Sequence, residues 1–216
     1  MPNKKHNNIV KIIKILESIY TDAKTDLIHS SPFELLIATM LSAQCTDKRV
    51  NIVTPLLFAK YPTGNDLAIA DASDVESIIM STGFYKNKTK NIIGTSKMLI
   101  SNFNSCVPST MQELITLPGV GRKTANCVLG TYFEPQGIVV DTHVIRITNL
   151  LGITNTKNAD HIEEQLIEIV PKNYWSKFAH LLIRHGRNIC IARRPKCSEC
   201  VVNKYCNTYT GSKLKA

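Results

Sequence analysis

We expect this protein to be built from α-helices, because three features of its 216-residue sequence point the same way. Apolar residues recur at helical spacing, first at Ile9, Ile12, Ile13, Leu16 and Ile19. Residues that favour helix N-termini precede several such segments. The alternation of apolar and polar residues that marks a half-buried strand is missing from the sequence, which therefore predicts an all-α fold.

Start signals allow individual helices to be placed. Ser31 is a strong N-cap with Glu34 reaching back, and the helix over residues 33–43 is apolar nearly all round, so it should be buried. A second capping box beginning at Ser73 opens a short helix that stops near Gly83. Further helices are expected over residues 86–102, 142–151, 159–170 and 174–189. The linker candidate is residues 134–137, Glu-Pro-Gln-Gly.

The charge of the chain suits a polyanionic partner. The formal net charge is +9, and within residues 181–216 eight Lys or Arg stand against the single acid Glu199. The first fourteen residues add four lysines and no acid. Both chain ends are therefore basic, which favours nucleic acid as the partner.

We expect a cytoplasmic protein. No apolar run approaches the length that spans a membrane. Lys11, Lys14 and Glu17 interrupt any apolar region of a signal peptide. Seven cysteines in an intracellular chain argue against a disulfide framework and for metal-binding or reactive thiols.

The segment Leu-Pro-Gly-Val-Gly-Arg-Lys-Thr-Ala, residues 117–125, is the most informative stretch. Pro118 should end the preceding helix, because it has no N–H to donate and restricts Leu117. Gly119 and Gly121 permit backbone angles or close approaches that a side chain forbids. The segment therefore predicts a tight turn between two helices.

A helical pattern resumes at Arg122 and continues to Thr131, so the turn presents N–H groups at a helix N-terminus, where anions bind well. A P-loop is excluded because Arg122 separates Gly121 from Lys123. A dinucleotide-binding motif is excluded because it needs a preceding strand. An ordinary helical hairpin with a glycine turn remains the structural alternative.

Four cysteines near the C-terminal end have the spacing C-x6-C-x2-C-x5-C: Cys190, Cys197, Cys200 and Cys206. Thiolates so close in sequence can hold one metal centre, either zinc or an iron–sulfur cluster. Zinc sites usually place two chelating pairs around a longer spacer, so zinc is the weaker interpretation. The other three are interpreted as small apolar residues: Cys45, Cys106 and Cys127.

These motifs together resemble the endonuclease III family of helix-hairpin-helix DNA glycosylases. The glycine turn with Lys123 resembles the family's lysine form, and the cysteine spacing matches its cluster loop residue for residue. The resemblance covers about Ser31 to Cys206. It implies a [4Fe-4S] cluster bound by the four cysteines. It also implies a six-helix domain over 22–134, a second helical domain that joins 1–21 to 135–216, and a cleft between the two.

The resemblance implies that Lys123 is the catalytic nucleophile, whereas an isolated lysine would be interpreted as a surface charge. Its amine would attack C1′ of the damaged nucleoside and form an imine. The imine makes the C2′ proton acidic, and the 3′-phosphate then leaves by β-elimination.

Asp141 precedes a helix in the setting Val-Asp-Thr-His, and two roles remain open for it. Asp at this position is a preferred N-cap. The resemblance implies a second catalytic residue, whose carboxylate stabilises developing oxocarbenium charge or helps to deprotonate the attacking amine. Both roles can coexist.

The damaged base must leave the duplex to be reached. The resemblance implies that Gln44 fills the vacated stack, and Phe84 stands where relatives carry an aliphatic wedge. The first cysteine loop carries Arg193, Arg194 and Lys196, which either bind backbone phosphates or form a solvated charge run. Further DNA contacts are expected from the hairpin and from the Val-Asp-Thr-His segment, at Gly119, Val120, Gly121, Arg122, Thr124 and His143.

We therefore expect a bifunctional DNA glycosylase and apurinic/apyrimidinic lyase that excises oxidised pyrimidines. It would act as a monomer on double-stranded DNA with damaged bases or abasic sites, in the cytoplasm at the nucleoid. One alternative is a monofunctional adenine-type glycosylase, which shares the cysteine spacing but usually has another residue than lysine at position 123. The other is a non-catalytic DNA-binding module with a redox-sensing cluster, which would bind duplex DNA without cleaving it.

Overall fold

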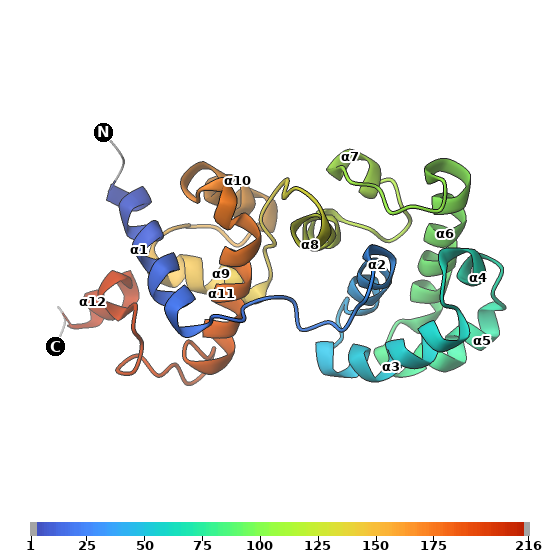
Figure 1. Ribbon diagram of the computed structural model, residues 1–216. Coiled ribbons are helices and arrows are strands. Elements are labelled where there is room, and N and C mark those ends of the chain that lie inside the picture. The colour runs from blue at the N-terminus through green and yellow to red at the C-terminus, as the bar shows by residue number, and fades with distance from the viewer. Residues whose placement is uncertain (1–3, 214–216) are drawn as a thin grey trace. The chain divides into compact units, whose positions relative to one another are not determined.

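The computed structural model describes residues 4–213, and every regular element within that range is helical (Figure 1). No strand occurs among the described residues, which confirms the all-α prediction. Residues 1–3 and 214–216, the two ends of the expected second domain, lie outside the described residues. None of the described helices is both long enough and apolar enough to cross a membrane.

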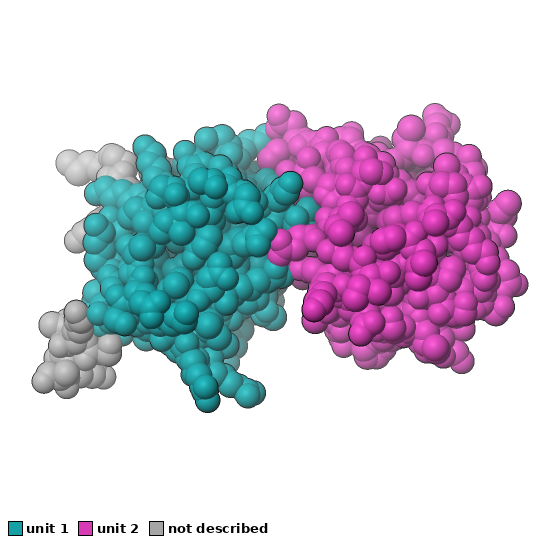
Figure 2. Space-filling view, turned by 60° about the horizontal axis from the view of Figure 1, so that its bottom comes forward, with its two compact units in different colours: residues 1–25, 137–216 teal, residues 26–136 magenta. Residues whose placement is uncertain are grey.

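The chain forms two compact units (Figure 2). One unit is continuous and comprises residues 26–136. The other joins residues 1–25 to residues 137–216, so it is discontinuous in sequence. The catalytic candidates Lys123 and Asp141 belong to different units, and the four cysteines belong to the discontinuous one.

The continuous unit is organised around α2, which contacts α3, α6 and α8. All seven residues from Leu35 to Leu41 are buried, as its apolar sequence predicts. Each buried Leu or Ile there stabilises the fold by roughly 1.5–3 kcal/mol. The helices of this unit are α2 (Pro32–Leu41), α3 (Asp47–Lys60), α4 (Gly64–Ala68), α5 (Ala72–Ile79), α6 (Tyr85–Phe103), α7 (Met111–Leu114) and α8 (Arg122–Tyr132), with the 3-10 turn η1 (Met80–Thr82).

The ends of α2 follow local chemistry. The Ser31 hydroxyl accepts a hydrogen bond from the Glu34 N–H at 3.2 Å, which confirms the predicted N-cap. The Glu34 carboxylate binds the Ser30 N–H at 2.6 Å, one residue before the cap. At the other end, the helix stops at Leu41, before the predicted residue 43.

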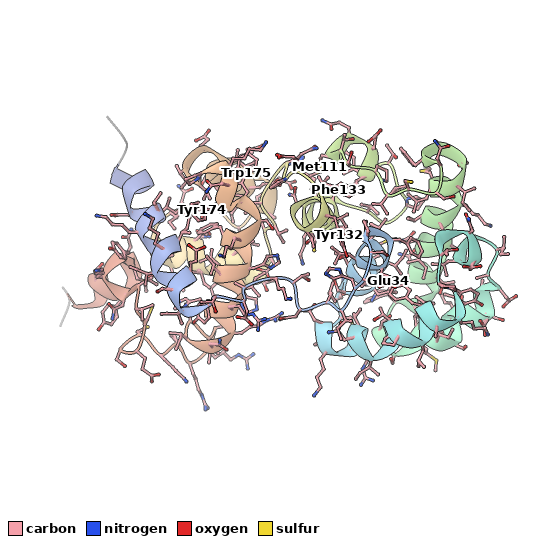
Figure 3. The ribbon with its side chains drawn as sticks, in the orientation of Figure 1. Glu34, Met111, Tyr132, Phe133, Tyr174 and Trp175 are labelled. Carbon is pink, nitrogen blue, oxygen red and sulfur yellow. The ribbon has the colours of Figure 1, made fainter. Side chains whose placement is uncertain are left out.

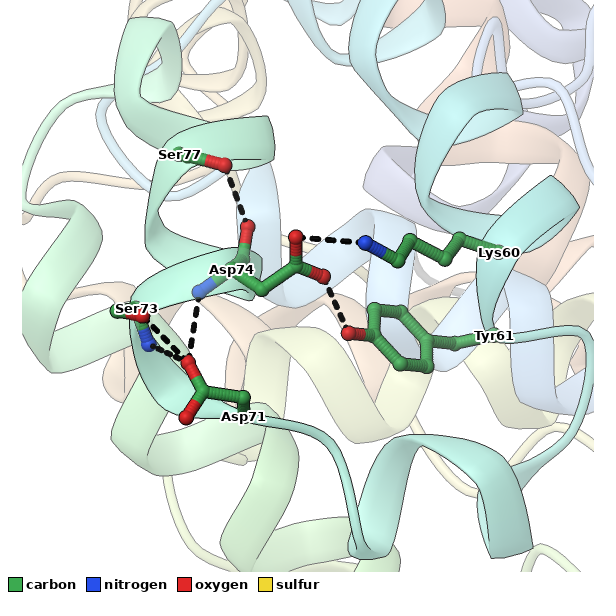
Figure 4. A network of polar contacts seen from close by, with 6 residues as sticks. All are labelled: Lys60, Tyr61, Asp71, Ser73, Asp74 and Ser77. Atoms are coloured by element: carbon green, nitrogen blue, oxygen red, sulfur yellow. Dashed lines mark hydrogen bonds and ion pairs between the residues drawn. The ribbon is translucent and has the colours of Figure 1, made fainter.

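The predicted capping box at Ser73 is wrong, because α5 begins earlier (Figure 4). Asp71 is the N-cap, and its Oδ1 accepts from the N–H groups of Ser73 at 2.9 Å and Asp74 at 3.1 Å. Asp74 lies inside the helix and uses its carboxylate to bind α3 instead. It accepts from Lys60 Nζ at 2.6 Å and from the Tyr61 hydroxyl. The network therefore joins the end of α3 to the start of α5.

The packing of α8 on α2 is supplemented by polar contacts at the end of α8. Tyr132 and Phe133, labelled in Figure 3, lie partly buried against the core of the unit. The Tyr132 hydroxyl is 2.7 Å from Nδ1 of His29, which lies just before α2. The Met111 N–H donates to Gln136 Oε1 at 2.8 Å, which ties the last residue of this unit to the start of α7.

The discontinuous unit is built around α11, which packs against α1 and α9. Its core includes Ile12 and Leu16 from α1, Ile147 from α9, and Phe178 and Leu182 from α11. The elements of this unit are α1 (Lys4–Ile19), α9 (Thr142–Leu151), α10 (Ala159–Ile169), α11 (Trp175–Asn188) and α12 (Asn207–Lys213), with the 3-10 turns η2 (Lys172–Tyr174) and η3 (Asn203–Tyr205). Helix α12 packs on α9 and was not predicted from the sequence.

Candidate active site and cysteine loop

The glycine turn has the geometry that its sequence predicts. The Val120 N–H donates to the Leu117 carbonyl at 3.1 Å, so Pro118 and Gly119 are the two central residues of a four-residue turn. Gly119 has φ +74°, the left-handed value that the second central position of a type II turn requires. The first helix, however, ends at Leu114, before the residue that the proline signal indicated.

The two glycines of the hairpin differ in whether a side chain could replace them. A Cβ at Gly119 would lie 2.5 Å from Asn91 Nδ2, so both the backbone angle and the space exclude a side chain. A Cβ at Gly121 would meet nothing within 4 Å, and its backbone is extended. The turn is also held by α6, where the Thr95 hydroxyl donates to the Pro118 carbonyl at 2.9 Å.

Lys123 lies exposed at the second position of α8. Gly121 is the N-cap of this helix and has no side chain with which to cap it. The first turn of α8 therefore presents backbone N–H groups and the positive end of the helix dipole beside Lys123. The opposite face is buried and fixes the helix to the core through Ala125, Val128 and Leu129.

Gln44 and Phe84 line one hollow of about 200 Å³ in the continuous unit. Both are exposed, Phe84 at 68%, and both have left-handed backbones, with φ 54° and 48°. Left-handed angles are unfavourable for residues other than glycine and gather at functional sites. Gly119, Lys88 and Asn91 also line the hollow, so the structure brings the two predicted stack-filling residues together with the hairpin turn.

Asp141 is the N-cap of α9, which confirms the structural half of its prediction. Its Oδ1 accepts from the Val144 N–H at 2.8 Å. His143 lies in the first turn of the same helix, with Nδ1 3.3 Å from an Nη atom of Arg146. Burial lowers the pKa of His143, Asp141 opposes that shift, and Arg146 and Arg187 add to it. The neutral imidazole is therefore favoured in this setting.

The four cysteines of the C-terminal motif line one cavity of about 130 Å³. The cavity is also lined by apolar residues that include Leu150, Ile189 and Pro195. Among the described residues, no three His, Cys, Asp or Glu side chains lie close enough together to hold a single metal ion. Four thiols around one largely apolar space fit the donor set of an iron–sulfur cluster.

The pKa values of the Cys190 and Cys200 thiols at this cavity also indicate that thiolates here need a positively charged partner. Burial raises the pKa of the Cys190 thiol, and neighbouring cysteines raise it further, while Arg146 lowers it. The pKa of the Cys200 thiol is raised, again mainly by burial. Thiolates placed here need a positive partner, which bound iron supplies.

Neighbouring side chains orient the cysteine loop. Arg146 donates to the Cys190 carbonyl at 2.6 Å. His185 is 2% exposed, with Nε2 3.4 Å from Cys200 Sγ and Nδ1 3.4 Å from the Tyr20 hydroxyl. Burial lowers the pKa of His185 to about 4. Such contacts fix the orientation of groups around metal ligands.

The cations of the first cysteine loop are all exposed: Arg193, Arg194 and Lys196. The Lys196 N–H donates to the Ile189 carbonyl at 2.9 Å and closes the loop on the end of α11. The prediction of Cys106 as a small apolar residue is wrong, because its side chain is exposed, whereas Cys45 and Cys127 are partly buried.

Three polar residues that lie beside the predicted sites were not predicted from the sequence: Lys88, Arg146 and His185. The only signals were positional. Lys88 follows Phe84 by four residues, and Arg146 lies on the helix that Asp141 caps. His185 lies five residues before Cys190.

The hairpin, the helical fold and the cysteine cavity define a base excision DNA repair protein of the helix-hairpin-helix class. Residues 37–172 match the model of the HhH-GPD superfamily base excision DNA repair proteins. Residues 190–206 match the model of the iron-sulfur binding domain of endonuclease III.

Similar proteins narrow the class to one family. The chain is 45% identical over 203 residues to an endonuclease III of Synechocystis, covering 94% of this chain and 93% of that protein. It is 43% identical to the endonuclease III of Escherichia coli over 84% of this chain and 86% of that protein. The chain belongs to the endonuclease III family. It is accordingly a DNA glycosylase and apurinic/apyrimidinic lyase with a [4Fe-4S] cluster.

Two solved structures of similar proteins agree with the fold. One is a non-covalent complex of endonuclease III with DNA, with TM-score 0.90 and 40% identity over 98% of this chain and 99% of that chain. The other is a trapped covalent intermediate of endonuclease III with DNA, also with TM-score 0.90 and 40% identity, over 96% of this chain and 98% of that chain.

Proposed function

We propose that this enzyme excises oxidised pyrimidines from double-stranded DNA through an imine at Lys123, and that Asp141 assists. The observation that carries the proposal is the placement of Lys123, exposed in the first turn of α8 directly after the type II turn. The similar endonuclease III that was trapped as a covalent intermediate with DNA supports a covalent step in the reaction of this enzyme. The enzyme acts as a monomer, in the cytoplasm on nucleoid DNA.

The chemistry proceeds in two steps that share one lysine. The Nζ lone pair of Lys123 attacks C1′, the N-glycosidic bond breaks, and the base departs with the bonding electron pair and a proton that Nζ gives up. The C1′–O4′ bond then breaks, O4′ takes its electron pair and a proton, and the Nζ lone pair completes the C1′=N imine. The resulting imine draws electrons from C1′, so a base can remove the C2′ proton. The electron pair of that C–H bond forms the C1′–C2′ enamine and then expels the 3′-phosphate. Water finally hydrolyses the imine and releases Lys123.

The charge of Asp141 stabilises the oxocarbenium character that develops at C1′ as the base leaves. The backbone N–H groups at the start of α8 bind a phosphate, which holds the strand beside Lys123. Gln44 and Phe84 occupy the gap in the stack when the damaged nucleotide leaves the duplex. Arg193, Arg194 and Lys196 bind phosphates without reading the sequence.

The [4Fe-4S] cluster is held by Cys190, Cys197, Cys200 and Cys206. When bound, it cross-links the C-terminal loop and gives it a fixed shape. The protein's contribution is the largely apolar cavity, with Arg146 contacting the Cys190 carbonyl and His185 contacting the Cys200 thiol.

The proposal is tested by reductive trapping. Wild-type protein is incubated with borohydride and duplexes that contain an abasic site or thymine glycol. We expect a covalent protein–DNA adduct that Lys123→Gln abolishes while duplex binding persists. Lys97→Gln, a change at an exposed lysine on α6, is the matched control and should keep the adduct.

Each alternative activity has its own outcome in this assay. An adduct that persists in Lys123→Gln moves the nucleophile to another residue. Release of adenine without an adduct identifies a monofunctional adenine-type glycosylase. Tight duplex binding without base release or strand cleavage identifies a non-catalytic module.

A further inference from the structure

Lys88 is a buried lysine that the chemistry above does not use. It lies on α6 and is 7% exposed. Its Nζ donates to two backbone carbonyls, those of Leu41 and Thr82, each at 2.8 Å. Lysine is rarely buried to this degree, because an ammonium group loses its hydration when it enters the interior. Burial accordingly lowers the pKa of Lys88.

The two carbonyls that Lys88 binds belong to two different segments. Leu41 is the last residue of α2, and Thr82 is the last residue of η1. These segments are far apart in sequence, and one ammonium group ties their ends together. The carbonyls at a helix C-terminus carry partial negative charge and lack partners within the helix, so a cation is a favourable partner for them.

Each tied segment leads directly to one of the two left-handed residues that line the hollow. Gln44 follows Leu41 by three residues, and Phe84 follows Thr82 by two. Both hold backbone angles that cost of order 1–3 kcal/mol for residues other than glycine. Such angles persist only when surrounding contacts impose them, and the two bonds from Lys88 are contacts of that kind. Lys88 itself lines the same hollow.

We propose that Lys88 is a positioning residue that holds the backbones of Gln44 and Phe84 ready to enter the base stack. It touches neither the damaged nucleotide nor the reacting atoms. This inference rests on the proposed function, in which those two side chains fill the gap that the extruded base leaves. Preorganisation matters here because ordering both segments during base extrusion would add to the cost of unstacking.

The inference predicts which step depends on Lys88. Excision of thymine glycol from a duplex requires the base to leave the stack and the gap to be filled. Cleavage at a preformed abasic site in single-stranded DNA requires neither, although it uses the same Lys123 chemistry. A loss of positioning should therefore slow the first reaction and spare the second, whereas partial unfolding slows both.

The test compares single-turnover rates of both reactions for wild type and Lys88→Met, which removes the donors and keeps a long side chain. We expect duplex excision to fall by about tenfold or more, with single-strand cleavage within about twofold. Lys97→Met is the matched control, since Lys97 is an exposed lysine on the same helix. It should leave both rates unchanged.

A double-mutant cycle shows whether Lys88 acts through the two residues. In a Gln44→Ala, Phe84→Ala background, Lys88→Met should cause little further loss of duplex excision, because the side chains it positions are gone. Equal losses in both backgrounds, equal losses on both substrates, or no loss at all would overturn the inference. If Lys88→Met does not fold, Lys88→Leu, which also lacks a hydrogen-bond donor, is measured by the same criteria.

Failure of the proposed function gives a different result. If wild type forms no adduct and excises no base, or if Gln44→Ala and Phe84→Ala leave duplex excision unchanged, the proposed function or its stack-filling residues are wrong. If wild type is active and those two variants are slow, an unaffected Lys88→Met rejects the positioning role alone.

Discussion

Asp141 combines a structural contact with the position proposed for a catalytic carboxylate. Its Oδ1 accepts from the Val144 N–H at 2.8 Å and so caps α9. An asparagine at this position can make the same contact, because its amide oxygen is also an acceptor. Asparagine lacks the negative charge that stabilisation of an oxocarbenium ion or proton transfer requires. One substitution can therefore separate the two roles.

We expect Asp141→Asn to unfold at nearly the wild-type urea concentration, because asparagine caps helices about as well as aspartate. Its single-turnover rate of base excision should fall by roughly 100-fold or more, the usual contribution of a general acid–base group. Asp141→Ala should lose the same activity and, in addition, about 1 kcal/mol of unfolding free energy. Near-wild-type excision by Asp141→Asn would reduce Asp141 to a helix cap.

Among the elements, the junction of α3 and α5 carries the clearest titratable network (Figure 4). Hydrogen bonds from Lys60 and Tyr61 lower the pKa of Asp74 from its ordinary value of 3.8. The bond to Asp74 is also the main reason why the pKa of Tyr61 rises to about 12. The charged carboxylate and the neutral phenol are therefore the forms that the folded state favours.

The network makes stability depend on pH at both extremes. Because folding lowers the pKa of Asp74, its contribution is present above pH 3.8 and is lost as pH falls through the folded value. Folding raises the pKa of Tyr61, so that contribution is present below pH 10.0 and is lost as pH rises towards about 12. We expect the difference in urea midpoint between wild type and Asp74→Asn to shrink below about pH 4. A difference that does not change with pH would contradict the network.

The loop between Cys190 and Cys197 is the element proposed to bind phosphates. Arg193→Ala and Arg194→Ala should each weaken duplex binding equally for all sequences, because phosphates carry no sequence information. Each should reduce the slope of log K against log salt by roughly one. The control is Lys157→Ala, which removes an exposed cation elsewhere in the same unit and should keep the slope. An unchanged slope in the arginine variants would make this loop a solvated charge run.

At the scale of the whole molecule, two features join distant segments of the discontinuous unit: the packing of α1 on α11 and the cysteine loop. The N-terminal helix α1 packs on α11, so its buried Ile12 and Leu16 complete a core that residues 137–216 build. The cysteine loop has few buried residues of its own, since residues 191–199 are all exposed. We therefore expect its order to depend on the cluster, because metal binding and local folding are coupled.

We expect purified protein to contain about four irons per chain and to show the visible absorption of a thiolate-bound cluster. Cys197→Ser should lower both the iron content and the midpoint of thermal unfolding, because one ligand is lost. Cys106→Ser, at an exposed cysteine of the other unit, should change neither. Stoichiometric zinc in anaerobically prepared protein would reject the cluster assignment.

Short sequence patterns were sufficient to predict the fold class and several features of the site. The turn at Pro118 and Gly119 follows from a missing N–H and a left-handed angle, both of which are properties of adjacent residues. Asp141 as a cap follows in the same way. The spacing of the four cysteines indicated a shared centre, because ligands within seventeen residues can surround one cavity. Each of these signals is complete within a short stretch of chain.

Helix boundaries were less predictable, because neighbouring residues compete for the same role. Ser73 and Asp71 are both good N-caps, and Asp71 caps α5 while Asp74 binds Lys60 and Tyr61 at the end of α3. Helices α3 and α4 were not predicted from the sequence, and α3 contains Pro55 within its length. The role of Asp74 is thus set by side chains at the end of another helix, and a local sequence pattern does not show which residues will lie nearby.

The sequence by itself determined an all-α chain with a glycine hairpin and a four-cysteine loop, because capping, turn and ligand spacing are local properties. Tertiary structure alone decided that Lys88 is buried and that His185 lies between Tyr20 and Cys200. A helical lysine has the same local pattern whether it faces solvent or interior. Lys88 is buried because the carbonyls of Leu41 and Thr82, 47 and 6 residues away in sequence, converge on its ammonium group.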